Sequence, residues 1–251
     1  MKIGIITGAS SGLGREYARH AFENFGLDEL WLIARREGAM RDIAAQMPDR
    51  RIRVLPCDLS RTEEIDRICA LAAQEKPEIR LLVNNAGLGF LGDFETIEEK
   101  NNRAMCDVNM RAPTLLTAAL IPYMQRGAAI IFVSSIAAFA PTPRMSVYCS
   151  TKAYIQSLAK ALRYELSPRG IHVLAVYPCP MDTDFLAVGG INGNSKTFDM
   201  LPRCIPEKVA KVSLARAAAG KGSYTPLMLM KFYRVLAKLL PHSLIMPVSK
   251  T

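Results

Sequence analysis

Tyr148 and Lys152 are residues whose types and spacing could transfer a proton. They lie four positions apart at the start of a segment with helical periodicity, so one helical turn places both side chains on the same face. A phenol with its ordinary pKa of about 10 carries protons poorly at neutral pH, but a nearby ammonium favours the phenolate and lowers that pKa. The pair therefore predicts that Tyr148 acts as a general acid or base. Alone, such a pair is more often structural.

Ser135 is a third candidate for this chemistry. It follows Ser134 at the carboxyl end of an expected strand, thirteen residues before Tyr148. Ligands of open α/β sheets bind at that end of the strands, where a hydroxyl could hydrogen-bond a substrate oxygen and stabilise its developing charge. Two serines at a strand end are also more often structural. The prediction depends on their occurrence together with Tyr148, Lys152 and the turn described next.

A glycine-rich turn connects the first expected strand to the first helix. Gly8 permits a tight turn, Gly12 lets the backbone approach a pyrophosphate, and Gly14 lets helix and strand pack closely. The free N–H groups and positive dipole end of the helix could then hold phosphates. The candidate cofactor-binding residues of this turn are Gly8, Ser10, Ser11, Gly12, Leu13 and Gly14. Tight turns need glycine for steric reasons too, but a position directly after a buried strand favours nucleotide binding.

The second strand ends in Arg35 and Arg36, which indicate the kind of dinucleotide. An acidic side chain at this place would hydrogen-bond the ribose 2′-hydroxyl of NAD. A cation suits the 2′-phosphate of NADP(H) instead, so the sequence favours NADP(H) over NAD. The alternative, that the arginines are only solvated residues at a strand end, stays open for Arg36 in particular.

The elements that must position these residues alternate along the whole chain. Apolar runs of four to six residues indicate strands buried on both faces, and segments of helical periodicity lie between them. The expected strands are Ile3–Thr7, Leu30–Ala34, Ile52–Cys57, Leu81–Asn84, Ile130–Ser134 and Val173–Tyr177. One expected helix follows the glycine-rich turn and ends at Gly26. Two longer helices are expected over Arg111–Arg126 and Ser146–Ser167. The order predicts an α/β fold: a Rossmann-like, doubly wound parallel sheet with helices on both faces, as a single domain over residues 1–251.

Composition excludes several classes of protein. Of 251 residues, 50% are hydrophobic and 22% charged, which excludes a disordered or collagen-like chain. Six cysteines without a C-x-x-C pair and three histidines do not form a metal-ligand pattern, so no metal is expected. The apolar run at the N-terminus is too short for a signal peptide, and we expect a cytoplasmic protein.

The net charge of +9 admits nucleic acid, an anionic membrane surface or a phosphorylated ligand as partner. The basic residues are dispersed and no nucleic-acid recognition motif accompanies them, so no nucleic-acid partner is expected.

Together these motifs resemble the short-chain dehydrogenase/reductase family, of the compact single-domain kind. The matching residues occur in the family's order over about three quarters of the chain: Thr7–Gly14, Asp58, Asn84–Gly87, Asn109, Ser135, Tyr148 and Lys152. The resemblance implies that an NADP(H)-dependent oxidoreductase interconverts a carbonyl and an alcohol. It also implies a homodimer or homotetramer built on the long helices.

The resemblance further implies roles for single residues. Tyr148 would exchange a proton with the substrate oxygen, and Lys152 would hold the nicotinamide ribose and lower the tyrosine pKa. Ser135 would orient the carbonyl, and Asn109 would hold a water that links Lys152 to solvent. The remaining implied cofactor contacts are Asp58 at the adenine, Asn85, Ala86 and Gly87 beside its ribose, and Pro178 and Thr183 near the nicotinamide. Cys179 departs from the family pattern, which commonly has glycine after this proline.

Two segments are expected to serve the substrate side. Residues 184–206 match the variable substrate lid, with a mobile loop at Val188–Asn194 and an apolar lining from Phe185, Leu186, Phe198, Met200 and Leu201. This lining favours an apolar carbonyl substrate, although the same side chains could simply cover the sheet edge.

A helix over residues 226–240 carries Lys231, Arg234 and Lys238 in one row, which leaves a broad apolar face. Packing against the core or a second subunit is the first expectation for that face, with the substrate lid and a membrane surface as alternatives.

Three other functions are possible for a chain of this kind, two of them outside enzymes and one within. A catalytically silent NADP-sensing or scaffold protein could share this fold, but the tyrosine, lysine and serine are all present. A nucleic-acid binder has only the net charge in its favour. A sugar-nucleotide epimerase of similar fold usually carries a larger C-terminal substrate domain than this chain can hold.

Overall fold

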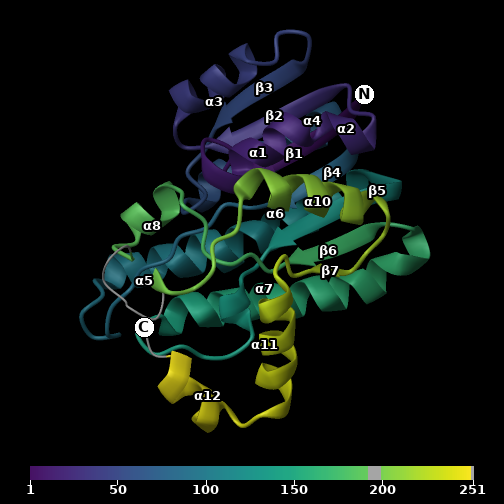
Figure 1. The fold of residues 1–251 in the computed structure, drawn as a ribbon. Helices are drawn as coiled ribbons and strands as arrows, with labels where there is room; N and C mark the ends of the chain where they lie inside the picture. Colours follow the sequence, from purple (N-terminus) through teal and green to yellow (C-terminus); the bar gives the residue numbers. More distant parts are fainter. Residues whose placement is uncertain (192–198, 250–251) are drawn as a thin grey trace.

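The computed structural model describes residues 1–191 and 199–249, and its centre is a parallel sheet of seven strands (Figure 1). The strand order is β3-β2-β1-β4-β5-β6-β7, which is the doubly wound arrangement. The strands are β1 (Lys2–Thr7), β2 (Glu29–Ala34), β3 (Arg51–Pro56), β4 (Glu78–Asn84), β5 (Met124–Val133), β6 (His172–Val176) and β7 (Ser223–Tyr224). The expected Rossmann-like, single-domain fold is therefore confirmed.

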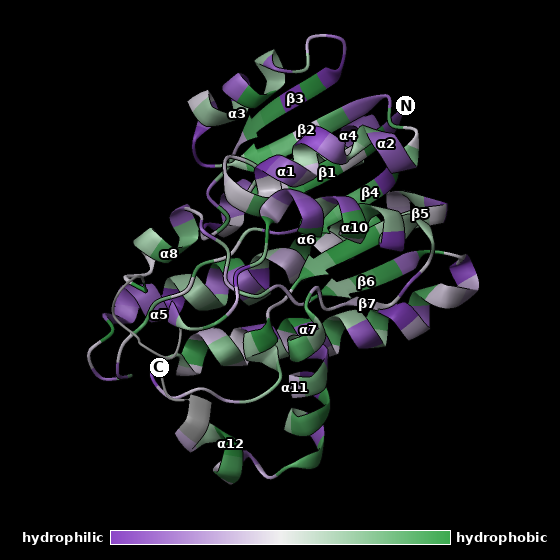
Figure 2. Cartoon of the chain, in the orientation of Figure 1, coloured by the Kyte–Doolittle hydropathy of each residue, from purple (hydrophilic) through white to green (hydrophobic). Residues whose placement is uncertain are grey.

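Helices cover both faces of this sheet (Figure 1). Those described are α1 (Gly12–His20), α2 (Phe22–Phe25), α3 (Glu37–Ala45), α4 (Thr62–Glu75), α5 (Glu99–Cys106), α6 (Ala112–Leu120), α7 (Ser146–Leu166), α8 (Asp184–Val188), α10 (Pro206–Ala218), α11 (Met228–Leu239) and α12 (His242–Ser249). Helices α1 and α10 pack together on one face, and α4, α6 and α7 lie on the other. Because both faces are covered, the strands are nearly continuous in hydrophobic residues (Figure 2).

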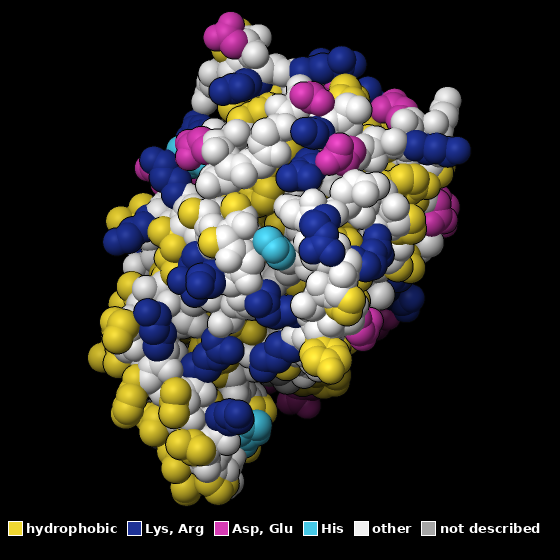
Figure 3. Space-filling view, turned by 90° about the vertical axis from the view of Figure 1, so that its right-hand side faces the viewer, with side chains coloured by type: hydrophobic (Ala, Val, Ile, Leu, Met, Phe, Trp, Pro, Cys, Tyr) yellow, Lys and Arg dark blue, Asp and Glu magenta, His cyan; other side chains and the backbone are white. Residues whose placement is uncertain are grey.

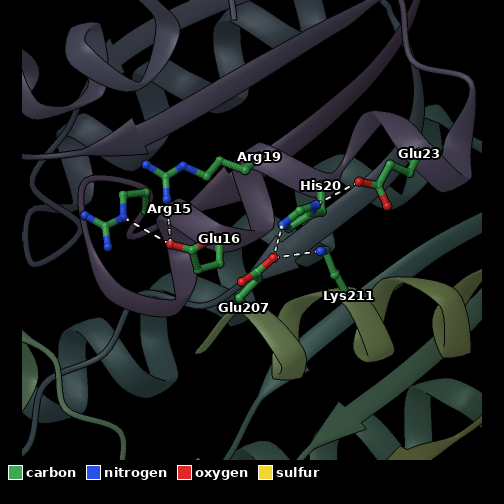
Figure 4. A network of polar contacts seen from close by, with 7 residues as sticks. All are labelled: Arg15, Glu16, Arg19, His20, Glu23, Glu207 and Lys211. Atoms are coloured by element: carbon green, nitrogen blue, oxygen red, sulfur yellow. Dashed lines mark hydrogen bonds and ion pairs between the residues drawn. The ribbon is translucent and has the colours of Figure 1, made fainter. Parts of the chain in front are cut away.

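A polar network joins α1 to α10 (Figure 4). The His20 ring lies 2.7 Å from Glu23 on α2 and 3.7 Å from Glu207 on α10, and Lys211 donates to Glu207 at 2.7 Å. This network connects the helix after the glycine-rich turn to the helix after the expected lid.

The helix expected over Arg111–Arg126 is shorter than predicted. A π-helical turn at Asp107–Arg111 precedes α6, which ends at Leu120, and Met124 already belongs to β5. Pro122 explains the early end, because proline lacks the N–H that a continuing helix requires. Gly127, at φ +83°, then lies in an irregular stretch where the β4–β5 register shifts.

The C-terminal helices α11 and α12 project from the sheet as a separate arm below α7 (Figure 1). Within residues 1–191 and 199–249, no helix is both long and apolar enough to cross a membrane.

Candidate active site

One cleft of about 1010 Å³ runs along the carboxyl ends of the strands, from the turn after β1 to the start of α7. That edge is where open α/β sheets bind their ligands. The cleft brings together nearly all the residues singled out in the sequence: Gly8, Ser10, Ser11, Gly12, Leu13, Gly14, Arg35, Arg36, Asp58, Asn85, Ala86, Gly87, Ser135, Tyr148, Lys152, Pro178 and Thr183. Asn109 lies behind the cleft wall.

The glycine-rich turn has a backbone that other residues could not adopt. Gly8 and Gly12 have φ values of +66° and +52°, in the left-handed region that favours glycine. A Cβ on Gly14 would lie 2.1 Å from the Gly8 carbonyl oxygen, so this glycine is required for the helix to start here. The turn therefore has the shape that places backbone N–H groups against a pyrophosphate.

The N-terminus of α1 is open to an anion. The Ser11 side chain makes no capping hydrogen bond, and the first turn contains no acidic residue. The positive end of the helix dipole thus faces the cleft, as a phosphate-binding site requires.

Thr7 and Asn85 hold this turn in place, and the role of Thr7 was missed in the sequence. The Thr7 Oγ1 accepts from the backbone N–H groups of Asn85 and Ala86 at 3.0 and 3.1 Å. Asn85 Nδ2 in turn donates to the Thr7 carbonyl at 2.9 Å. Buried backbone groups need such partners, so a hydroxyl at a strand end before glycine was the available signal.

Four charged side chains, Arg35, Arg36, Asp58 and Asp184, line the end of the cleft beside the glycine-rich turn. Arg36 donates to Asp184 at the start of α8 and, at 3.4 Å, to the Ser10 hydroxyl. Asp58 accepts from the backbone and hydroxyl of Ser60 at 3.0 and 2.8 Å. Burial raises the pKa of Asp58, but these hydrogen bonds and the positive charge of Arg35 outweigh it, so the pKa is lowered. Asp58 is thus an anion beside Arg35.

Tyr148, Ser135 and Lys152 meet at the other end of the cleft. The Tyr148 hydroxyl is hydrogen-bonded to the Ser135 side chain, whose oxygen also accepts from the Ala137 N–H at 3.1 Å. The Lys152 ammonium lies 5.7 Å from the centroid of the tyrosine ring and donates to the Val133 carbonyl at 3.0 Å. Two residues from one helical turn of α7 and one that follows β5 therefore lie together at this end of the cleft.

The pKa values in this group follow burial more than charge. Burial raises the pKa of Tyr148 to about 12, against the lowering effect of its bond to Ser135. Burial also lowers the pKa of Lys152 to about 8. Lys152 therefore does not bring the tyrosine pKa below its ordinary value in this arrangement, and its ammonium donates to the Val133 carbonyl.

Asn109 lies in the π-helical turn, a type of irregularity frequent at functional sites. Its Oδ1 accepts from the Leu88 N–H at 2.8 Å, and its Nδ2 donates to the Leu88 carbonyl at 2.8 Å and to Thr151 at 3.0 Å. A Cβ on Gly87 would lie 3.3 Å from both Asn109 Oδ1 and Lys152 Nζ. Asn109 thus fixes the loop after β4 beside Lys152.

The described part of the lid also contacts the tyrosine. The Phe185 ring on α8 lies 5.8 Å from the Tyr148 ring, and Leu186 and Leu201 line the same cleft. Met200, expected in the lining, is exposed instead. Phe198, expected in the lining, lies outside the described residues, as do Asn192–Asn194 of the expected loop. The Cys179 side chain lines the cleft and is hydrogen-bonded to that of Cys204.

The hydrogen-bond donors of this site fit a dinucleotide. Within the described ranges, no cluster of His, Cys, Asp or Glu side chains could hold a metal ion.

A family model described as short chain dehydrogenase matches residues 2–189. The chain is 30% identical over 189 residues to human dehydrogenase/reductase SDR family member 4, covering 73% of this chain and 67% of the relative. It is 32% identical over 196 residues to the uncharacterised oxidoreductase DltE of Bacillus subtilis, covering 76% and 74%.

Solved structures agree with this match. A short-chain dehydrogenase from Sphingobium yanoikuyae, in complex with NADPH, superposes with a TM-score of 0.81 at 28% identity, covering 95% of this chain and 93% of the other. A bulky-bulky ketone specific alcohol dehydrogenase from Comamonas testosteroni has a TM-score of 0.76 at 26% identity, covering 95% and 92%. The chain belongs to the short-chain dehydrogenase family and is an oxidoreductase of that class.

Proposed function

We propose that the protein is an NADP(H)-dependent oxidoreductase that interconverts a carbonyl and an alcohol on an apolar substrate. One observation carries the proposal: a single cleft joins the glycine turn and Arg35 at one end to the Tyr148, Ser135 and Lys152 group at the other. Its volume of about 1010 Å³ suits a dinucleotide with a substrate beside it.

The residues of the cleft divide the work in this proposal. The nicotinamide cofactor, when bound, supplies or accepts the hydride. Tyr148 exchanges the proton with the substrate oxygen, and Ser135 hydrogen-bonds that oxygen. Lys152 holds the cofactor ribose, and Asn109 acts as a positioning residue that fixes the loop beside it.

NADP(H) is preferred over NAD because of the charges around the adenosine end. Arg35 and Arg36 both line the cleft, and either guanidinium could bind a 2′-phosphate. The Sphingobium relative is described in complex with NADPH, which supports this choice. A 3-ketoacyl-(acyl-carrier-protein) reductase from Brucella melitensis, 26% identical with a TM-score of 0.75, is described with NADH, and the test below compares both cofactors.

An apolar substrate is favoured by the walls around Tyr148. A buried cluster of hydrophobic residues surrounds this tyrosine, and Leu201 packs against it. On the opposite side, residues of α11 and α12 line the cleft, including Leu229, Tyr233 and Ile245. The Comamonas relative is named for bulky ketones, which agrees with a cleft of this kind. We also propose a cytoplasmic homodimer or homotetramer that uses α7.

The test measures oxidation of NADPH and NADH with a panel of ketones, aldehydes and acyl thioesters. Turnover with NADPH and apolar carbonyls supports the proposal. Tyr148→Phe should lower kcat by about 10²–10⁴-fold, the usual contribution of general acid–base catalysis, and leave the Kd for NADPH within about twofold. The matched control is Tyr154→Phe on the same helix, where the hydroxyl contacts only Thr114 among the described residues. NADPH binding without turnover would favour the silent sensor instead.

A further inference from the structure

Helix α11 presents an exposed hydrophobic ridge, and one of its residues, Phe232, also lines the edge of the cleft. Met228, Phe232, Val235 and Leu239 follow helical spacing on one face and are 74%, 62%, 54% and 73% exposed. The opposite face packs on the core through Met230 and Ala237. Since the ridge and the packed face are on opposite sides, packing against this chain's own core does not account for the ridge.

The ridge belongs to a concentrated apolar surface. Seven of the thirteen exposed large hydrophobic side chains of the described residues fall between Met228 and Leu244: Met228, Leu229, Phe232, Val235, Leu239, Leu240 and Leu244. Figure 3 shows hydrophobic side chains gathered at the lower end of the molecule, where Figure 1 places α11 and α12, with Lys and Arg side chains beside them. Isolated exposed hydrophobics are ordinary, but a contiguous patch marks an interaction site.

The charged side chains in this part of the sequence have one sign. Residues 208–251 contain eight Lys or Arg and no Asp or Glu. Lys231 and Lys238 are exposed on the flank of α11, and Arg234 lies over the Phe139 and Tyr177 rings, at 5.7 and 4.8 Å from their centroids. The Lys160 side chain on α7 lies close enough that Arg234 and Lys238, after burial, lower its pKa. A positive band thus follows one side of the ridge.

We propose that the α11–α12 arm is a docking surface for a bilayer that contains anionic phospholipid. The ridge inserts among the acyl chains near the headgroups, and Lys231 and Lys238 bind the lipid phosphates, as in other amphipathic helices at interfaces. Leu229, Leu236 and Leu244 of the same arm line the cleft, so the docked bilayer lies beside the cleft. This inference does not depend on the catalytic proposal, because its readout is lipid binding.

Charge favours the bilayer over a second copy of the chain. A two-fold contact through this ridge would bring the same surface of both copies together. The cations of both arms would then face each other, with no acidic residue in 208–251 to neutralise them. An anionic surface neutralises the same cations.

The experiment is flotation of the full chain with vesicles of phosphatidylcholine alone or of equal parts phosphatidylcholine and phosphatidylglycerol. The wild type should float with the anionic vesicles, less so as salt is raised, and weakly with the neutral ones. Val235→Ser with Leu239→Ser should weaken binding at least about tenfold, since two inserted hydrophobic side chains are lost. Tyr164→Ser, at a similarly exposed aromatic on α7, is the control.

A second pair of variants tests the charge and does not alter the apolar ridge. Lys231→Gln with Lys238→Gln should weaken binding to the anionic vesicles about tenfold and leave binding to the neutral ones unchanged. Lys221→Gln, outside the arm, is its control. Failure of the wild type to float with anionic vesicles overturns the proposal. So does a serine variant that changes the oligomer in light scattering yet floats like the wild type.

Discussion

Arg36 binds Asp184 through both terminal nitrogens of its guanidinium, at 3.0 Å each, although 148 positions separate the two residues in sequence. The pair connects the end of β2 to the start of α8 across the adenosine end of the cleft. Both side chains are more than half exposed, so water screens the attraction. In the proposed function, a 2′-phosphate would compete with Asp184 for Arg36.

Removing the carboxylate should therefore strengthen NADPH binding. An exposed pair of this kind contributes about 0.2–1 kcal/mol, so Asp184→Asn should lower the Kd for NADPH by up to about fivefold. The Kd for NADH, which has no 2′-phosphate, should not change. Titration calorimetry with both cofactors checks this. Asp182→Asn is the control, because this neighbouring carboxylate pairs with Arg203 instead. Weaker NADPH binding by Asp184→Asn would show that the pair is needed in the bound state.

Arg35 should decide the choice between the two cofactors. Its positive charge acts on Asp58, which locates it at the adenosine end of the cleft. Arg35→Asp should raise the Kd for NADPH at least about tenfold, because a charge-assisted hydrogen bond becomes a repulsion. The same change should leave NADH binding equal or tighter.

The control for this charge reversal is Arg41→Asp on α3, where the arginine pairs with Glu37 away from the cleft. Equal losses for both cofactors in Arg35→Asp would indicate damage to the turn, and would contradict a role in recognising the 2′-phosphate.

Two glycines in the first turns of their helices, Gly14 in α1 and Gly38 in α3, should respond in opposite ways to alanine. In Gly14→Ala the new Cβ would lie 2.1 Å from the Gly8 carbonyl oxygen, so the turn must move. We expect at least about tenfold weaker NADPH binding and a loss of about 2 kcal/mol of stability. A Cβ on Gly38 in α3 meets no atom within 4 Å, so Gly38→Ala should be neutral or stabilise by up to about 1 kcal/mol. Fluorescence titration with NADPH and urea unfolding measure both effects.

Six of the seven strands and the glycine turn could be predicted because local sequence determines them, whereas β7, with only two residues, was not expected. Buried parallel strands need continuous apolar runs, and Gly8 and Gly12 have backbone angles that other residues avoid. The predicted end of the helix before β5, at Arg126, was wrong. The apolar side chains continue past Leu120, where α6 ends, and only Pro122 marks the change from helix to strand. Periodicity alone does not separate a buried helix from a buried strand over so few residues.

Long-range pairings were beyond the sequence. Nothing near Asp184 indicates Arg36 as its partner, and nothing near Thr7 indicates that it holds Asn85 and Ala86. Such contacts depend on which strand ends meet in the folded sheet. The Tyr148 pKa is a similar case, since residue spacing gives the distance between two charges but not their burial, which dominates here.

The buried Lys152 ammonium should make stability depend on pH. In the folded protein burial lowers its pKa from the usual 10.5 to about 8. Between these values the unfolded chain holds the proton that the folded chain has lost, so the free energy of unfolding rises with pH. Below pH 8 the folded protein bears the full cost of the buried charge. Between pH 8 and pH 10.5 the free energy of unfolding should rise by about 3 kcal/mol at most, since each pH unit contributes about 1.4 kcal/mol.

Lys152→Met removes the titrating ammonium and keeps a side chain of similar length. The difference in free energy of unfolding between wild type and variant therefore isolates the pH dependence that Lys152 causes. Urea unfolding of both proteins at pH 7 and at pH 10 should show the wild type gaining stability relative to the variant. Other groups that titrate in this range, such as buried cysteines, are common to both proteins and cancel in the difference. A difference that stays constant, or that decreases with pH, would show that the Val133 carbonyl stabilises the charged form enough to offset its burial.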